Sequence, residues 1–161
     1  QLLTRPKEIY DGAMPSGNSV AALTLLKLSK YTARENFAQI ADRQLVAFAG
    51  TVQQYPPGYS MFLSAVDFAL GPGKEIVIAG DPEKEETRRM VQQVHQQFLP
   101  EAIVVQYPTG KAGEKVRLLI PLVQDKVAVE GKATAYVCEN YACKSPTTEL
   151  NELERLITTE G

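Results

Sequence analysis

The sequence predicts a mixed α and β fold, in which a helical N-terminal segment is followed by a smaller α/β segment. Between Ser16 and Leu70 the apolar residues recur three and four positions apart, which is the spacing of amphipathic helices. After Gly71, two short β-branched runs, "EIVIAG" and "AIVVQY", flank a helical pattern. This order is typical of a βαβ unit in a parallel sheet. We therefore expect a helical segment over 1–73 and an α/β segment over 74–161.

The first segment should contain three helices. A side-chain oxygen just before the first apolar stripe can accept a hydrogen bond from a free backbone N–H, so Asn18 or Ser19 is expected to cap the first helix. The run "YPPGYS" should separate the second helix from the third, because proline cannot continue a helix. The expected limits are Asn18 or Ser19 to Tyr31, Thr32 or Ala33 to Gln54, and Tyr59 to Leu70.

The second segment should begin with a strand, a crossover helix and a parallel strand. Asp81 is expected to cap the helix, with Pro82 as its first residue and Phe98 on its apolar face. The other expected elements are a final helix capped by Thr147 or Thr148 and further strands. The expected limits are strands Glu75 to Gly80, Ala102 to Tyr107, Val116 to Ile120 and Thr134 to Cys138, and a last helix Thr147 to Ile157.

Composition excludes several classes of partner. The 161 residues carry 17 basic and 19 acidic side chains, a net charge of −2, and no basic run that could neutralise a row of phosphates. Nucleic acid is therefore not an expected partner. The chain has no run of about 18 apolar residues and no secretory leader pattern, so we expect no membrane association and a cytoplasmic location. Because it begins with Gln1, we expect a piece of a longer protein.

Two further patterns are explained by structure rather than by chemistry. The turn "AGDPEKEE" lies between a strand and a helix, where a phosphate could bind, but it lacks the glycine pattern of nucleotide-binding loops, and its glutamates would repel an anion. Those acidic residues suit the N-terminal end of a helix. His95 is the only histidine and is expected at the surface. We expect no cofactor and no metal.

The two cysteines lie in "VCENYACKSP" as C-x-x-x-x-C. A redox pair is more often C-x-x-C, and a structural zinc site needs four ligands. The interpretation favoured by the sequence is that Cys138 and Cys143 are reduced, unreactive and flank a turn at Glu139 to Tyr141, since intracellular thiols are usually reduced. Thiol redox chemistry at this pair is the alternative.

The polar loop before the first helix is a candidate binding site. If the three helices are antiparallel neighbours, the first and third are parallel, and the loops that precede them meet at one end. Tyrosine rings beside carboxylate and amide groups suit a sugar, which needs stacking and directed hydrogen bonds. The alternative is that Asp11 and Asn18 only fix turns and caps. The candidate substrate-binding residues are Tyr10, Asp11, Ser16, Asn18, Tyr55 and Tyr59.

Two blocks, "EIYDGAMPSGNSVAALTLLKL" and "TAYVCENYACKSPTTELNEL", resemble the C-terminal part of the spermatogenesis-associated, thioredoxin-domain-containing proteins, which include the bacterial YyaL-like group. The resemblance spans nearly the whole chain. It implies that an N-terminal thioredoxin-like domain and most of a six-hairpin α/α toroid precede these residues. The toroid resembles glycosidases and sugar epimerases, so "DGAMPSGNS" would lie at its mouth. No catalytic residue is carried over.

Three functions follow as expectations. The first is a part of a carbohydrate-active or carbohydrate-binding toroid protein that is inactive as an isolated fragment. The second is a non-catalytic docking module for the preceding domains or for another partner. The third is a thiol redox partner of the thioredoxin-like domain. Because helices cut from a toroid would expose apolar faces, we also expect either that the α/β segment covers them or that the fragment self-associates.

Overall fold

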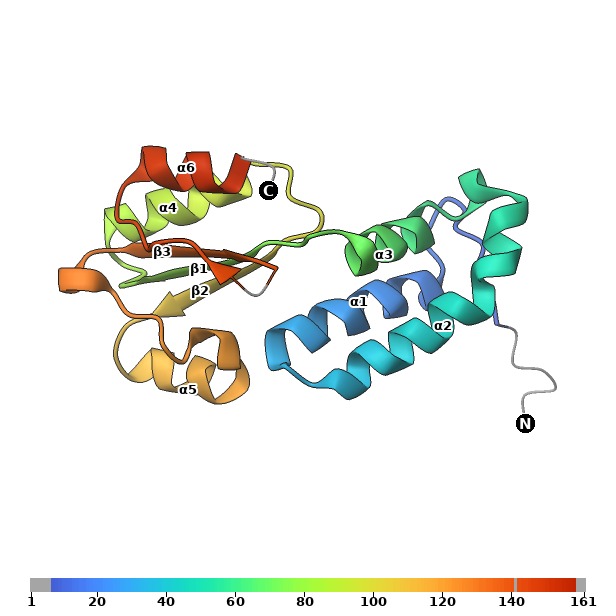
Figure 1. Cartoon of the computed structure of the whole chain (residues 1–161), viewed down its shortest axis with the longest axis horizontal. Coiled ribbons are helices and arrows are strands. Elements are labelled where there is room, and N and C mark those ends of the chain that lie inside the picture. The colour runs from blue at the N-terminus through green and yellow to red at the C-terminus, as the bar shows by residue number, and fades with distance from the viewer. Residues whose placement is uncertain (1–6, 141, 159–161) are drawn as a thin grey trace. The chain divides into compact units, whose positions relative to one another are not determined.

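The computed structural model (Figure 1) describes residues 7–140 and 142–158 and divides the chain into two units, Gln1–Gly71 and Pro72–Gly161. The predicted mixed α and β fold is confirmed. In the described part of the chain, the first unit is helical, and the second has a four-stranded sheet with helices packed on it. Within the described residues, none of the helices has the length and apolar character needed to cross a membrane.

The described residues of the first unit form three α-helices. They are α1 (Gly17–Thr32), α2 (Glu35–Gln54) and α3 (Ser60–Leu70), with a short 3₁₀ turn at Pro56–Gly58. Figure 1 shows α1 and α3 running in the same direction and α2 running opposite to both. The expected antiparallel order is therefore confirmed, and the limits of the second and third helices agree with the prediction to within three residues.

The predicted cap of the first helix was wrong. Ser16 caps α1, because its extended backbone places its Oγ 3.1 Å from the Ser19 N–H, which donates to it. Asn18 and Ser19 lie inside the first turn instead. The apolar pattern does not distinguish the three polar residues at this point, since any of them could accept such a bond.

Alanines and aromatic residues form the interior of the helical unit. Ala22, Ala41 and Ala65, one from each helix, are completely buried, and such small side chains allow helices to approach closely. A second cluster lies nearer the tyrosines, where the Phe48 and Phe62 rings meet edge to face with centroids 6.4 Å apart. Its buried members are Ile9, Val52 and Phe62.

The sheet of the second unit has the order β2-β1-β3-β4. Strand β1 is parallel to β2 and antiparallel to β3, and β3 is antiparallel to β4. The predicted βαβ unit is confirmed, because α4 (Glu85–His95) connects the parallel pair. The strands are β1 (Glu75–Gly80), β2 (Ile103–Pro108), β3 (Thr134–Glu139) and β4 (Ala142–Cys143).

Figure 1 shows α4 and α6 (Leu150–Thr158) on one face of this sheet and α5 (Lys111–Leu119) on the other. The first face carries the main core, in which alternate residues of β1 and β3 meet the apolar stripes of α4 and α6. The core residues include Ile76, Ile78, Met90, Val94, Ala135, Val137, Leu153 and Ile157. His95 is exposed, as predicted.

Two element predictions in this unit were wrong. The expected strand Val116 to Ile120 lies mostly in helix α5. The prediction failed because an apolar run this short has no periodicity that distinguishes a helix from a strand. Leu118 and Leu119 are 85% and 68% exposed. The crossover helix begins at Glu85 rather than Pro82, because the Asp81 side chain accepts from the Glu83 N–H in a turn before the helix.

The ends of two helices also differ from expectation. Helix α4 ends at His95, so Phe98 does not line its apolar face and is 90% exposed. The last helix begins at Leu150 rather than Thr147. The Thr147 Oγ1 accepts from the Glu149 N–H, so Thr147 organises the turn that leads into the helix.

Candidate functional site

Three tyrosines gather where the N-terminal ends of α1 and α3 meet, and we call Tyr10, Tyr55 and Tyr59 the tyrosine rim. The Tyr10 and Tyr59 rings meet edge to face, with centroids 5.9 Å apart. Tyr10 is 51% exposed and Tyr55 is 57% exposed. The prediction that the two aromatic loops lie at the same end of the helices is therefore confirmed.

Gly58 lies directly beneath the exposed rings. A Cβ atom at this position would be 2.7 Å from the Tyr10 ring and 2.8 Å from the Tyr55 ring, so both rings pack on the glycine backbone. The Gly58 carbonyl also accepts from the Asp11 N–H at 2.9 Å. The two loops are thus joined through the backbone as well as through the rings.

Asp11 holds the N-terminal ends of two helices. Its Oδ1 accepts from the Ser16 N–H at 2.8 Å, at the start of α1, and its Oδ2 accepts from the Phe62 N–H at 3.0 Å, in the first turn of α3. Asp11 is only 8% exposed. Its carboxylate therefore caps α3 from a position far away in the sequence and has little surface to offer a ligand.

The environment of Asp11 favours its ionised form. Burial raises the pKa of the Asp11 carboxyl, but hydrogen bonds from the backbone N–H groups of Ser16 and Phe62 outweigh burial and hold the pKa below its usual range. The Ser19 hydroxyl and the Met61 N–H add to this lowering. The carboxylate is thus a poor candidate for a general acid near neutral pH, because it stays ionised.

The other two polar candidates also bond within the protein. Ser16 is buried and caps α1. The Asn18 Nδ2 donates to the Glu8 carbonyl at 2.5 Å, and the Asn18 carbonyl accepts from the Gln44 Nε2. These bonds fit the alternative in which Asp11 and Asn18 fix turns and caps. They leave the binding role of the six candidate residues as a prediction.

Sequence reasoning overlooked one polar group at the rim. Glu8 is exposed, and its Oε1 accepts from the Tyr10 N–H at 3.2 Å. Glu8 and Tyr10 are two positions apart, which places side chains of an extended segment on the same side and could have indicated the pair. Within the described residues, the rim thus has exposed aromatic faces, hydroxyls and one exposed carboxylate. This set can bind a polar ring, whereas acid/base catalysis would need a second group.

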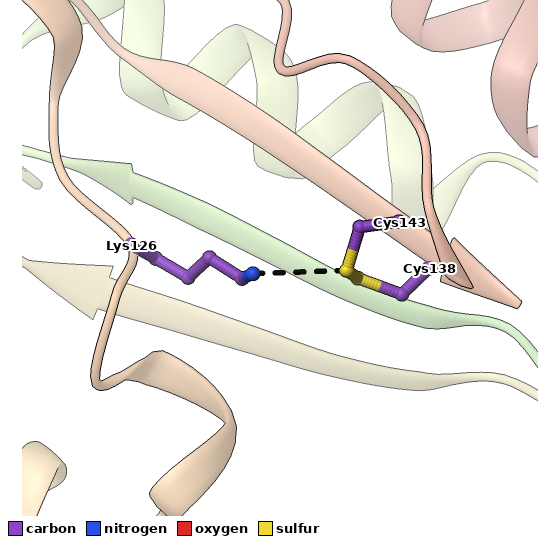
Figure 2. The surroundings of a disulfide bond; sticks show 3 residues. All are labelled: Lys126, Cys138 and Cys143. Atoms are coloured by element: carbon purple, nitrogen blue, oxygen red, sulfur yellow. Dashed lines mark hydrogen bonds between the residues drawn. A yellow bond between two sulfur atoms is a disulfide. The ribbon is translucent and has the colours of Figure 1, made fainter. Parts of the chain in front are cut away.

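The cysteines form a second candidate site, and the expectation that they are reduced was wrong. Cys138 and Cys143 are joined by a disulfide with an S–S distance of 2.04 Å (Figure 2). They are register partners on β3 and β4, so the hairpin places their side chains together. The expected turn between them is present, and Asn140 has a positive φ of 50° there; Tyr141 lies outside the described residues.

Lys126 is the residue that sequence reasoning missed at this site. Its Nζ lies 3.7 Å from the Cys143 Sγ, as Figure 2 shows, and 5.2 Å from the centroid of the Tyr136 ring. Lys126 precedes Cys143 by 17 residues and lies in a loop, so no local spacing connects the two. The disulfide therefore has a cationic side chain beside its exposed sulfur.

Comparison with curated proteins extends these observations. The human protein named spermatogenesis-associated protein 20 is 33% identical over 153 residues, which are 95% of this chain and 19% of that protein. The chain is similar to this protein along almost all of its own length. The rat protein of the same name is 31% identical over 153 residues, again 95% of this chain and 19% of that protein. An uncharacterised protein of Caenorhabditis elegans is 25% identical over 92% of this chain and 20% of its own length.

The chain thus spans about one fifth of the length of the curated relatives that it matches. This similarity supports the resemblance to spermatogenesis-associated proteins, but it supports neither the α/α toroid nor a carbohydrate role. No family model matches the chain, and no solved structure matches it significantly.

Proposed function

We propose that this chain supplies a carbohydrate-contacting surface, the tyrosine rim, to a longer protein. In this proposal the helical unit is the closing part of an α/α toroid, and a thioredoxin-like domain lies elsewhere in the longer chain. The observation that carries the proposal is the pair of exposed rings, Tyr10 and Tyr55, packed on the backbone of Gly58. We place this role in the cytoplasm.

The chemistry of the rim suits a saccharide. A tyrosine ring offers an apolar face to the C–H side of a sugar and a hydroxyl that can donate or accept a hydrogen bond. The exposed Glu8 carboxylate can accept from sugar hydroxyls next to the Tyr10 ring. Two rings fixed by backbone contacts lose little freedom on binding, so they provide contact area at a low entropic cost.

In this proposal Asp11 is a positioning residue. Both of its carboxylate oxygens accept backbone hydrogen bonds, so its role is to fix the segment that carries Tyr10. The reacting groups of any glycosidase-like or epimerase-like reaction would come from the rest of the longer protein. We accordingly expect the 161-residue chain alone to bind saccharides weakly and to catalyse nothing.

The test is a titration of the ¹⁵N-labelled 161-residue chain with a panel of neutral saccharides and nucleotide sugars. We expect at least one sugar to shift the amide resonances of Tyr10, Tyr55 and Gly58. Gly58→Ala should abolish these shifts, because the added methyl group displaces both rings without removing them. Phe98→Ala is the matched control, since Phe98 is an exposed aromatic residue of the other unit.

Two results would refute the proposal. Either no member of the panel moves a resonance at the rim, or the Gly58→Ala and Phe98→Ala variants bind equally well. Either result would favour the second candidate, a docking role for the α/β unit. The observation behind that candidate is the high exposure of Phe98 and Leu118, at 90% and 85%. Light scattering then decides whether the occupant is a second copy of the chain.

A further inference from the structure

The disulfide between β3 and β4 has the asymmetry of a reactive site. Cys138 is 3% exposed, whereas Cys143 lies on the edge strand and is exposed. The Lys126 ammonium lies 3.7 Å from the Cys143 sulfur. We propose that Cys138–Cys143 is a thiol–disulfide exchange site at which an external dithiol reacts with the Cys143 sulfur. In this proposal the Lys126 ammonium attracts the incoming thiolate and stabilises a thiolate on Cys143.

The disulfide adds little to the architecture around it. It closes a loop between residues only five positions apart, and short loops give a disulfide its smallest entropic effect. The two cysteines are already register partners in the hairpin, and the Lys144 N–H donates to the Val137 carbonyl at 3.0 Å. The strand pair therefore has its own hydrogen bonds with or without the S–S bond, which leaves a chemical role as the better explanation.

Access decides which sulfur reacts. Exchange proceeds by in-line attack of a thiolate on one sulfur of the disulfide, so the attacked sulfur must be reachable from solvent. Cys143 meets this condition and Cys138 does not. Attack at Cys143 leaves the buried Cys138 as the departing group, and it remains next to the reactive sulfur for the reverse reaction.

Tyr136 keeps Lys126 in place. The Val127 N–H donates to the Tyr136 hydroxyl oxygen at 3.1 Å, and the same hydroxyl donates to the Val127 carbonyl at 2.8 Å. The Lys126 Nζ lies over the Tyr136 ring, 5.2 Å from its centroid, where the cation is attracted to the ring face. The ammonium thus lies between the Tyr136 ring and the Cys143 sulfur, where it can attract an incoming thiolate and stabilise a thiolate on Cys143.

The proposed exchange takes place in two steps. The thiolate of the external dithiol attacks the Cys143 Sγ, the Cys138–Cys143 bond breaks, and its electron pair leaves on Cys138, which takes up a proton. The product is a mixed disulfide between the dithiol and Cys143. The second thiol of the same dithiol then loses its proton and attacks the first sulfur of the dithiol, which is bonded to the Cys143 Sγ in that mixed disulfide. Cys143 leaves as a thiolate beside Lys126. The protein disulfide has gained two electrons, and the dithiol has become a disulfide.

The first test maps the mixed disulfide and needs no variant. The oxidised 161-residue chain is incubated briefly with reduced glutathione, a monothiol whose first attack leaves a mixed disulfide, and is quenched with N-ethylmaleimide before a second glutathione can release it. Cleavage after Glu139 separates the two cysteines for mass spectrometry. We expect glutathione on Cys143 and maleimide on Cys138. Glutathione mainly on Cys138, or equally on both, would overturn the proposal.

A redox titration decides whether the site exchanges under native conditions. We expect the disulfide to be half reduced within the range of ordinary glutathione buffers, while far-UV circular dichroism shows the chain still folded. A disulfide that opens only at denaturant concentrations that unfold the chain would be a structural bond, and the proposal would be wrong.

The second test isolates Lys126. In a Cys138→Ser background, iodoacetamide should alkylate Cys143 roughly fivefold more slowly when Lys126→Gln is added, which is the effect expected of one charge at this distance in a solvent-exposed site. Lys126→Arg should restore most of the rate, because it restores the charge. Lys144→Gln is the matched control, since Lys144 adjoins Cys143 in sequence. An equal loss in Lys126→Gln and Lys144→Gln, or no loss in either, would refute the role of Lys126.

Discussion

Replacing Asp11 with alanine tests the central structural feature of the helical unit. The substitution leaves the Ser16 and Phe62 N–H groups without their acceptor, although the Asp11 carboxylate holds both at 2.8 and 3.0 Å in the native protein. Removing a capping side chain costs about 0.5–2 kcal/mol, and leaving a buried donor unpaired costs about 1–3 kcal/mol. With two donors affected, Asp11→Ala should lower the free energy of unfolding of the helical unit by about 2–4 kcal/mol.

The assay is urea unfolding followed residue by residue through amide resonances, because a chain with two units need not unfold in one step. The Ser16 and Phe62 resonances report the helical unit, and those of β1 report the other. Asp42→Ala is the matched control, since Asp42 is an exposed aspartate in α2 of the same unit. If Asp11→Ala and Asp42→Ala differed by less than about 0.5 kcal/mol, the spread of ordinary surface substitutions, Asp11 would not be a cap.

The remaining predictions concern acidification and two glycines. The pKa of Asp11 is lowered in the folded chain, so its stabilising effect is complete above the unfolded value of about 3.9 and is lost as pH falls through the lower folded pKa. The stability difference between wild type and Asp11→Asn should therefore shrink between about pH 5 and pH 2, and a constant difference would contradict this linkage. Gly50→Ala should stabilise α2 by about 0.5–1 kcal/mol in urea unfolding, because nothing lies within 4 Å of its Cβ position. Gly113→Ala should instead destabilise α5, because its Cβ would lie 2.2 Å from the Pro108 carbonyl oxygen; the reverse order of these two variants would show that the packing of α5 on β2 is misjudged.

Apolar periodicity carried most of the fold prediction. The α2 and α3 helices and strands β1, β2 and β3 follow patterns that continue over a whole element, so their type was predictable and their ends were close. The five-residue run at Val116 to Ile120 was too short for its period to be read. Helix α5, which contains most of this run, begins directly after Gly110. Gly110 has a φ of 75°, and the sequence at this point indicates only a polar turn.

The candidate sites depend on contacts that no local pattern contains. The sequence indicated that the loops around Tyr10 and Tyr59 would meet, because helix order alone decides this. It could not indicate that the Asp11 carboxylate would accept a hydrogen bond from the Phe62 N–H, 51 positions away, or that the Lys126 side chain would lie beside Cys143. The disulfide was missed for a different reason, since a general rule about intracellular thiols was given more weight than the proximity of two cysteines on either side of a turn.

The cap that Asp11 provides has a consequence for the order of folding. Helix α1 carries its own cap, Ser16, and can begin to form from neighbouring residues alone. The first turn of α3 receives the Asp11 carboxylate only after the chain between Asp11 and Phe62, which are 51 positions apart, has folded back on itself, and this requires α1 and α2 to be in place. The helical unit is therefore expected to assemble from the hairpin of α1 and α2, and the first turn of α3 is completed last by a residue that precedes all three helices in the sequence.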